Sequence, residues 1–231
     1  MNSIMANSTG ALSFGKQLEK EIEGEVLFDN FSRGQYATDA SIYQMIPTGV
    51  VVPKNSSDIE KVINLSRKEG ISLLARGGGT SQSGQTVNNS VVLDNSKFLN
   101  KIIEIDVKNR SCVVEPGIVL DELNRILKPH GLWFPVDIST SSRATIGGMA
   151  ANNSCGGRSI RYGTMRDNVI SIEGFMSDGS YCHFGTMENP NTSDLSKALK
   201  LIGERDALEI QHRFPKLIRR VGGYNIDALI P

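Results

Sequence analysis

Three consecutive glycines, Gly77 to Gly79, follow a short predicted strand and lead into hydroxyl side chains. Glycine costs backbone entropy, so such a run is expected where φ is positive or where a ligand touches the backbone. Successive backbone N–H groups in a turn of this kind form a nest that binds anions. Arg76 precedes the run and adds a charged donor, and hydroxyl donors follow at Thr80, Ser81 and Ser83. The loop predicts a pyrophosphate site, and a flexible turn between strands is the alternative.

Two better-known phosphate motifs do not fit this loop. The dinucleotide fingerprint G-x-G-x-x-G opens a helix, whereas Gln82 occupies its third glycine position and a strand is expected next. The P-loop G-x-x-x-x-G-K-[ST] matches Gly79 to Thr86 in spacing, except that Gln85 stands at the lysine position. Without that lysine a γ-phosphate lacks its cation, so the sequence argues against a nucleotide triphosphatase.

A second stretch rich in glycine, asparagine and serine runs from residue 135 to residue 163. Thr145 is a good N-cap, and apolar residues follow at helical spacing as far as Ala150. The N-terminus of this short helix would supply unpaired N–H groups suited to a pyrophosphate. Asn152 to Ser154 would then supply side-chain hydrogen bonds. A mobile surface loop is the alternative, which the helical spacing disfavours.

The elements around these stretches alternate between strands and helices. Strands are expected at 49–53, 71–75, 91–94, 101–106, 112–115, 170–176 and 181–184, where β-branched or apolar runs meet turn residues. Helices are expected at 16–23, 59–69, 120–128 and 193–212, from helical spacing and from turn residues at their ends. From this order we expect a tail with a short helix over 1–30, a first α/β subdomain over 31–100 and a second over 101–231.

The composition narrows the class of protein. Of the 231 residues 39% are hydrophobic, and Lys plus Arg and Asp plus Glu each number 25, so the formal net charge is zero. A general nucleic-acid binder is usually basic, so no nucleic-acid partner is expected. Three cysteines without a C-x-x-C motif argue against a disulfide framework or a structural zinc site, and favour a reducing compartment. We expect no transmembrane segment or signal peptide, and a cytoplasmic location, with peripheral membrane attachment left open.

The two glycine-rich stretches, in this order, resemble the FAD-binding (PCMH-type) domain of the vanillyl-alcohol oxidase / para-cresol methylhydroxylase superfamily. The resemblance is strongest to the branch of FAD-linked D-lactate dehydrogenases, glycolate oxidases and D-2-hydroxyglutarate dehydrogenases, especially members with a C-terminal iron–sulfur module. The other matching segments are Tyr36–Ser41, Val51–Lys54, Val114–Gly117, Ser139–Gly148 and Arg161–Asp167.

The resemblance implies an α+β flavoprotein fold in which FAD lies between two α/β subdomains. It implies oxidation of a D-2-hydroxy acid by hydride transfer to the flavin. The electrons would pass to an iron–sulfur module, a quinone or a cytochrome. Covalent flavin attachment in this superfamily uses histidine or cysteine. Because none of the three histidines lies in or before the glycine loop, we expect dissociable FAD.

The resemblance also implies which residues surround the cofactor. The backbone of Gly77 to Ser81 would hold the pyrophosphate, Ile146 to Gly148 would pack on the FAD, and Asn152 to Gly156 would border the flavin. The full expected set is Arg76, Gly77, Gly78, Gly79, Thr80, Ser81, Gln82, Gly84, Gln85, Pro135, Asp137, Ser141, Thr145, Ile146, Gly147, Gly148, Asn152, Asn153, Ser154, Cys155, Gly156, Tyr162 and Gly163. No catalytic residue or metal ligand is assigned.

The family domain continues past the point where this chain stops, so we expect a truncated domain. An iron–sulfur cluster is expected only in a missing C-terminal module. The alternatives are a non-catalytic module that binds FAD or a completing polypeptide, an anion-binding α/β protein without flavin, and a MurB-like reductase that uses NADPH.

Overall fold

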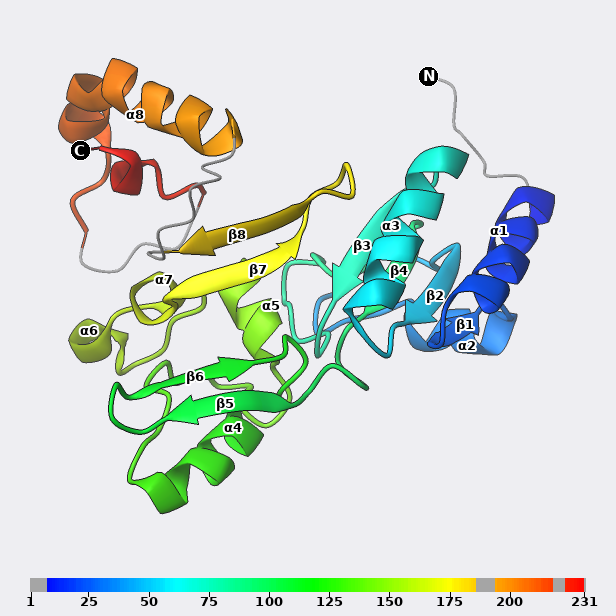
Figure 1. The fold of residues 1–231 in the computed structure, drawn as a ribbon, viewed down its shortest axis with the longest axis horizontal. Coiled ribbons are helices and arrows are strands. Elements are labelled where there is room, and N and C mark those ends of the chain that lie inside the picture. The colour runs from blue at the N-terminus through cyan, green and yellow to red at the C-terminus, as the bar shows by residue number, and fades with distance from the viewer. Residues whose placement is uncertain (1–7, 186–193, 218–222, 231) are drawn as a thin grey trace.

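The computed structural model describes residues 8–185, 194–217 and 223–230, which form two groups of elements (Figure 1). The first group is α1 (Ser8–Glu21), β1 (Glu25–Leu27), α2 (Asn30–Gln35), β2 (Gly49–Val52), α3 (Ser56–Glu69), β3 (Leu73–Arg76) and β4 (Val91–Asp94). The second is β5 (Ile102–Asp106), β6 (Ser111–Val114), α4 (Leu120–Leu127), η1 (Lys128–His130), α5 (Ile146–Ala151), α6 (Ser159–Tyr162), α7 (Met165–Asn168), β7 (Ser171–Phe175), β8 (Tyr181–Gly185), α8 (Asp194–Arg213) and η2 (Ile226–Leu229).

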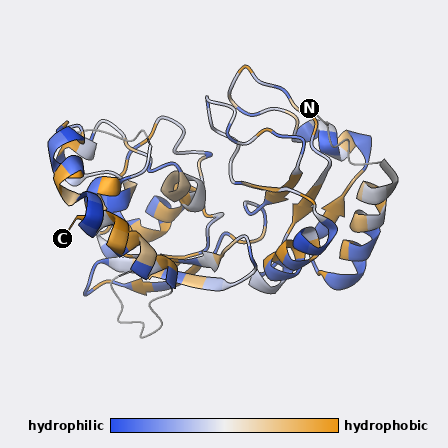
Figure 2. Ribbon diagram, turned by 90° about the horizontal axis from the view of Figure 1, so that it is seen from above, coloured by the Kyte–Doolittle hydropathy of each residue, from blue (hydrophilic) through white to orange (hydrophobic). Residues whose placement is uncertain are grey.

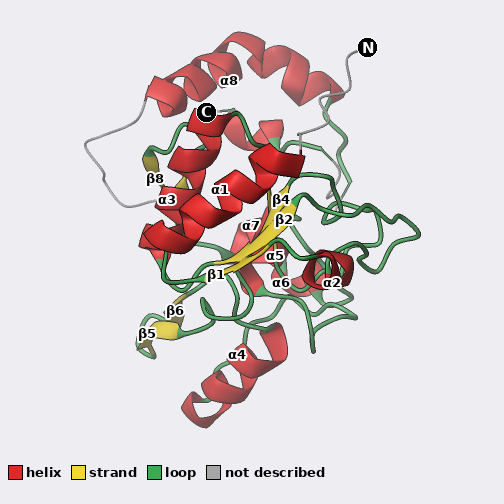
Figure 3. Cartoon of the chain, turned by 90° about the vertical axis from the view of Figure 1, so that its right-hand side faces the viewer, coloured by secondary structure: helices red, strands yellow, loops and turns green. Residues whose placement is uncertain are grey.

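A four-stranded sheet in the order β1-β2-β4-β3 organises the first group. β2 and β3 both run parallel to β4, while β1 pairs with β2 in the antiparallel direction. β2 and β4 are buried along their whole length, as continuous apolar strands covered on both faces should be. α1 and α3 cover one face of this sheet (Figure 3), and the strands stand out as its apolar layer in Figure 2.

The first helix differs from the prediction of a short helix over 16–23. α1 begins at Ser8 and ends at Glu21, and Phe14 and Leu18 are buried in one cluster with Val51 and Val62. β1, which the sequence did not predict, then pairs with β2. The helix therefore begins earlier than predicted, because Phe14 and Leu18 pack in the first layer.

Asp58 holds the start of α3 against the chain that leaves α1. Its side chain is fully buried, and its two carboxylate oxygens accept hydrogen bonds from the backbone N–H groups of Glu23 at 3.0 Å and Lys54 at 2.9 Å. Asn55 caps α3 by accepting from the Asp58 N–H at 2.9 Å, and Gly70 ends the helix at φ 66°.

Two antiparallel hairpins, β5–β6 and β7–β8, belong to the second group. α4 packs its buried Leu123 and Leu127 against the first hairpin, and a separate core gathers Met149 of α5 and Met165 of α7. The predicted strands are confirmed to within two residues. The helices expected at 120–128 and 193–212 are confirmed too, although Ser193 lies outside the described residues. In the part of the chain that is described, no helix is long and apolar enough to cross a membrane.

Candidate cofactor site

The two glycine-rich stretches pack against each other, although they are far apart in sequence. A Cβ atom at Gly77 would collide with the hydroxyl of Thr145, and one at Gly78 would collide with the backbone carbonyl of Arg143. Only glycine at these two positions allows the loop after β3 to lie directly on the chain that enters α5. The two stretches that the resemblance places around the cofactor therefore lie side by side.

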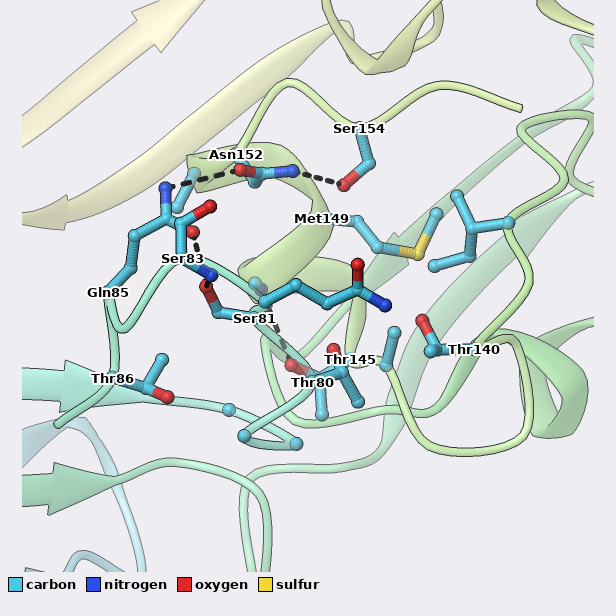
Figure 4. Close-up of a pocket in the computed structure, with 18 of the residues that line it drawn as sticks. Thr80, Ser81, Ser83, Gln85, Thr86, Thr140, Thr145, Met149, Asn152 and Ser154 are labelled. Atoms are coloured by element: carbon cyan, nitrogen blue, oxygen red, sulfur yellow. Dashed lines mark hydrogen bonds between the residues drawn. The ribbon is translucent and has the colours of Figure 1, made fainter. Parts of the chain in front are cut away.

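A cleft of about 450 Å³ lies between them (Figure 4). This volume falls within the range of small-molecule sites, about 300–1,000 Å³. Of the expected residues, the cleft is lined by Gly77, Gly78, Gly79, Thr80, Ser81, Gln82, Gln85, Thr145, Gly148, Asn152, Ser154 and Cys155.

The loop offers the cleft a row of unpaired backbone donors. Among the described residues, the N–H groups of Gly77 to Gln82 donate no hydrogen bond to another part of the chain. Gly79 has φ 63°, and its carbonyl accepts from the Ala40 N–H at 3.2 Å, which fixes the turn from outside. Consecutive unpaired amides at a bend form an anion nest. The loop therefore fits a pyrophosphate by its backbone.

The N-terminus of α5 does not offer the unpaired N–H groups that the sequence predicts there. Its first N–H groups already have partners within the chain. The Ile146 N–H donates to the Ile118 carbonyl at 2.9 Å and the Gly147 N–H donates to the Pro116 carbonyl at 2.8 Å. The Gly148 N–H donates to the Thr145 hydroxyl at 3.3 Å. The prediction of unpaired N–H groups at this helix is wrong, because distant carbonyls and the cap occupy them.

Arg76 holds the glycine loop in place through hydrogen bonds to backbone carbonyls. Its guanidinium donates to the backbone carbonyls of Tyr36 at 3.3 Å, Thr86 at 3.1 Å and Thr38 at 2.9 Å, and it lies 5.3 Å from the centre of the Tyr36 ring. Arg76 does not line the cleft. It therefore joins both ends of the loop to the segment 36–38.

A hydrogen bond between Tyr36 and Asp94 also holds the segment 36–38 in place. The Tyr36 hydroxyl donates to Asp94 at 2.7 Å. Burial, together with this hydrogen bond to a carboxylate, raises the pKa of Tyr36 above its ordinary value, so the phenol stays neutral. On the other side, Asp39 accepts from the Thr86 hydroxyl at 3.0 Å. Burial alone would raise the pKa of Asp39, but hydrogen bonds from Ser41 and Thr86 lower it, so its carboxylate stays ionised.

A chain of polar side chains crosses the cleft (Figure 4). The Ser81 hydroxyl donates to the Gln85 side-chain carbonyl at 2.6 Å, and the Gln85 amide donates to Asn152 at 3.5 Å. The Asn152 amide in turn donates to the Ser154 hydroxyl at 3.1 Å. These side chains present neutral donors and acceptors next to the amide nest.

Several expected residues support the site without lining it. A Cβ at Gly147 would collide with Pro116, one at Gly156 with the Asp137 carbonyl, and Gly163 has φ 80°. The set outside the lining is Arg76, Gly84, Pro135, Asp137, Ser141, Ile146, Gly147, Asn153, Gly156, Tyr162 and Gly163.

The expected set omits eight lining residues, although Ser83 was named among the hydroxyl donors of the loop. Met149 and Ala144 are buried and have the spacing of core residues, which hid their place on the cleft wall. Thr86 carried no signal beyond its polarity. The omitted set is Ala75, Ser83, Thr86, Ile138, Thr140, Ala144, Met149 and Ala151. Within the described ranges, no group of histidine, cysteine and carboxylate side chains is placed to hold a metal ion.

The chain is similar to known proteins over most of its length. The family model described as "FAD binding domain" matches residues 47–185. The D-2-hydroxyglutarate dehydrogenase of Pseudomonas putida is 37% identical over 219 residues, which are 89% of this chain and 22% of that protein. The D-lactate dehydrogenase of Archaeoglobus fulgidus is 34% identical over 163 residues, which are 70% of this chain and 36% of that protein.

A solved structure of alkyldihydroxyacetonephosphate synthase has the same fold, with a TM-score of 0.67 at 21% identity. It matches 77% of this chain and 34% of that one. The chain thus spans only about a fifth of the length of the D-2-hydroxyglutarate dehydrogenase. The cleft and the backbone anion nest agree with the family model, which covers more than half of the residues. The chain therefore belongs to the FAD binding domain family.

Proposed function

We propose that this chain is the FAD-binding part of an oxidoreductase that oxidises a D-2-hydroxy acid. The observation that carries the proposal is the row of unpaired N–H groups from Gly77 to Gln82 on a cleft of suitable size. Relatives named D-2-hydroxyglutarate dehydrogenase and D-lactate dehydrogenase support the substrate class. Bound FAD would supply the redox chemistry by accepting a hydride from the substrate.

The residues of the chain would bind and orient the cofactor. The backbone of Gly77 to Gln82 would hold the pyrophosphate, and Gln85, Asn152 and Ser154 would offer hydrogen bonds to its neutral polar groups. Met149 and Ala144 would give an apolar floor that keeps water from one side of the ligand. Asp137 and Arg76 would hold the surrounding loops in place.

We also propose the division into two subdomains near residues 97–101, with the cofactor between them. The partners of the whole protein would be a small 2-hydroxy acid and an electron acceptor or completing polypeptide. No disulfide joins the cysteines Cys112, Cys155 and Cys182, which supports a cytoplasmic, reducing location.

The first test is an absorbance spectrum of the purified chain after addition of FAD and desalting. We expect a retained and shifted flavin band near about 450 nm, and release of the FAD on acid precipitation. A folded chain that retains no flavin would contradict the cofactor role.

The substrate class is tested next, by anaerobic addition of a D-2-hydroxy acid to the loaded protein, with the L-enantiomer as control. Bleaching by the D-form alone supports the proposal. Flavin that is retained but not bleached would make the chain a module that holds FAD without turnover.

Replacing Arg76 with lysine should weaken FAD binding about tenfold, equivalent to about 1.4 kcal/mol. Lysine keeps the charge but has no planar fork, so it cannot hold three carbonyls at the two ends of the loop. A flavin fluorescence titration measures the Kd. Arg125→Lys, at an exposed position paired with Glu122, is the matched control. Equal affinity in the two variants would refute the positioning role of Arg76.

A further inference from the structure

The turn between β7 and β8 reaches the helix α3, which belongs to the other group of elements (Figure 1). A Cβ atom at Gly179 in this turn would collide with the side-chain oxygen of Asn64 and would lie 3.7 Å from the Arg67 guanidinium. Gly179 also has φ 81°, a conformation that favours glycine. We call this contact, between the turn Ser177–Ser180 and the side chains of Asn64 and Arg67, the latch.

The turn side of the latch is held by its own hydrogen bonds and carries a charge opposite to that of Arg67. The Met176 N–H donates to the Ser180 carbonyl at 2.8 Å, and the Gly179 N–H donates to the Met176 carbonyl at 2.9 Å. Hydrogen bonds from Ser180 lower the pKa of Asp178 below its ordinary value, and the positive charge of Arg67 lowers it further. The Asp178 carboxylate is therefore ionised and attracted to Arg67. Both side chains are exposed, so the attraction is weak and can be broken reversibly.

Each side of the latch is connected to one wall of the FAD cleft. The hairpin follows α7, whose Met165 is buried in one cluster with Met149, and Met149 lines the cleft. On the other side, α3 packs Val62 and Leu65 into the core of the sheet whose strand β3 leads into the glycine loop. The latch closes a ring of packed elements around the cleft. Parting the turn from α3 would let the two walls separate while both cores stay intact.

We propose that the latch gates the entry and release of FAD, an inference that rests on the proposed function. No residue of the latch lines the cleft, so the contact contributes the same free energy with and without FAD. A contact of this kind does not alter the affinity, but it controls how often the cleft opens. Weakening the latch therefore accelerates both association and release, and leaves Kd nearly unchanged. A purely structural defect at this surface would weaken binding without accelerating association.

The first test reverses a charge on α3. Arg67→Glu places a carboxylate near Asp178, and Lys68→Glu makes the same change of charge on the neighbouring residue of the last turn. Stopped-flow flavin fluorescence on the 231-residue chain gives the rates of FAD association and release. Relative to Lys68→Glu, we expect Arg67→Glu to raise both rates about threefold with a Kd within about twofold. Arg67→Lys keeps the charge and should keep the rates of the unmodified chain.

The second test changes the shape of the contact. Gly179→Ala should raise both rates about fivefold, because its Cβ pushes the turn away from Asn64. Adding Asn64→Ala removes the collision and should return both rates to within about twofold of the unmodified chain. Gly131→Ala is the control for backbone strain, since Gly131 has φ 68° and an added Cβ there meets no atom within 4 Å. It should leave both rates unchanged.

The latch is overturned if the rates stay unchanged in Arg67→Glu and Gly179→Ala, or if association becomes slower in either variant. Failure of Asn64→Ala to rescue Gly179→Ala would overturn it too. Equal acceleration by Gly131→Ala would assign the effect to backbone strain, with the same consequence. An unmodified chain that binds no FAD would instead refute the proposed function, on which the latch depends.

Discussion

Replacing Gly78 with alanine is expected to abolish FAD binding, with at least a hundredfold rise in Kd. The new Cβ would overlap the Arg143 carbonyl, which is a backbone atom and cannot rotate away. Arg143 is itself held by its N–H, which donates to the Thr140 carbonyl at 2.9 Å. The loop must therefore move, and its amides lose the alignment that a pyrophosphate requires. Fluorescence titration with FAD measures the effect.

The matched control for this substitution is Gly157→Ala. A Cβ there would lie 3.8 Å from an Asp137 carboxylate oxygen, an ordinary contact distance. It places one methyl group near the same site without forcing the backbone to move. We expect near-normal affinity, and far-ultraviolet circular dichroism should show both variants folded. If Gly78→Ala bound FAD as tightly as Gly157→Ala, the close packing of the two stretches would have no bearing on binding.

Asp58→Ala is expected to lower the free energy of unfolding by about 3 kcal/mol. The substitution leaves the partly buried N–H groups of Glu23 and Lys54 without their carboxylate partner, and an unsatisfied buried donor costs about 1–3 kcal/mol. Urea denaturation followed by circular dichroism gives the value.

Glu60→Ala, at an exposed position of the same helix, should cost less than about 0.5 kcal/mol. Asp58→Asn keeps one acceptor oxygen and should fall between the two. A loss for Asp58→Ala no larger than that for Glu60→Ala would mean that water replaces the carboxylate.

The parts of the fold that were predicted correctly carry strong local signals. β2 and β4 are continuous β-branched or apolar runs, and α3 has an N-cap at one end and a glycine at the other. α1 was placed wrongly because its packing is not local. Gly15 lowers its helix propensity, yet a Cβ there would lie 3.1 Å from the Phe28 ring. A glycine that weakens the sequence signal thus leaves room for the Phe28 ring against α1.

In the candidate site, too, local sequence signals were interpreted correctly, whereas contacts with distant segments were not. The glycine run and the helical spacing after Thr145 predicted two separate phosphate sites, and only the resemblance implied that both stretches surround one cofactor. The sequence did not show that the carbonyls of Ile118 and Pro116 would occupy the first amides of α5. The sequence also shows that Arg76 is charged, but not that it donates hydrogen bonds to three backbone carbonyls. Partners from distant segments decide whether a donor faces the ligand or the protein.

The hydrogen bond between Gln85 and Asn152 joins residues that are 67 positions apart in sequence. Because the cleft is made of such distant segments, it does not exist in the unfolded chain. A ligand that binds only the folded state adds to its stability by mass action, by about 2.7 kcal/mol at a hundredfold excess over Kd. Supply of the cofactor and survival of the folded chain are therefore coupled, and the apoprotein is the form most exposed to proteolysis.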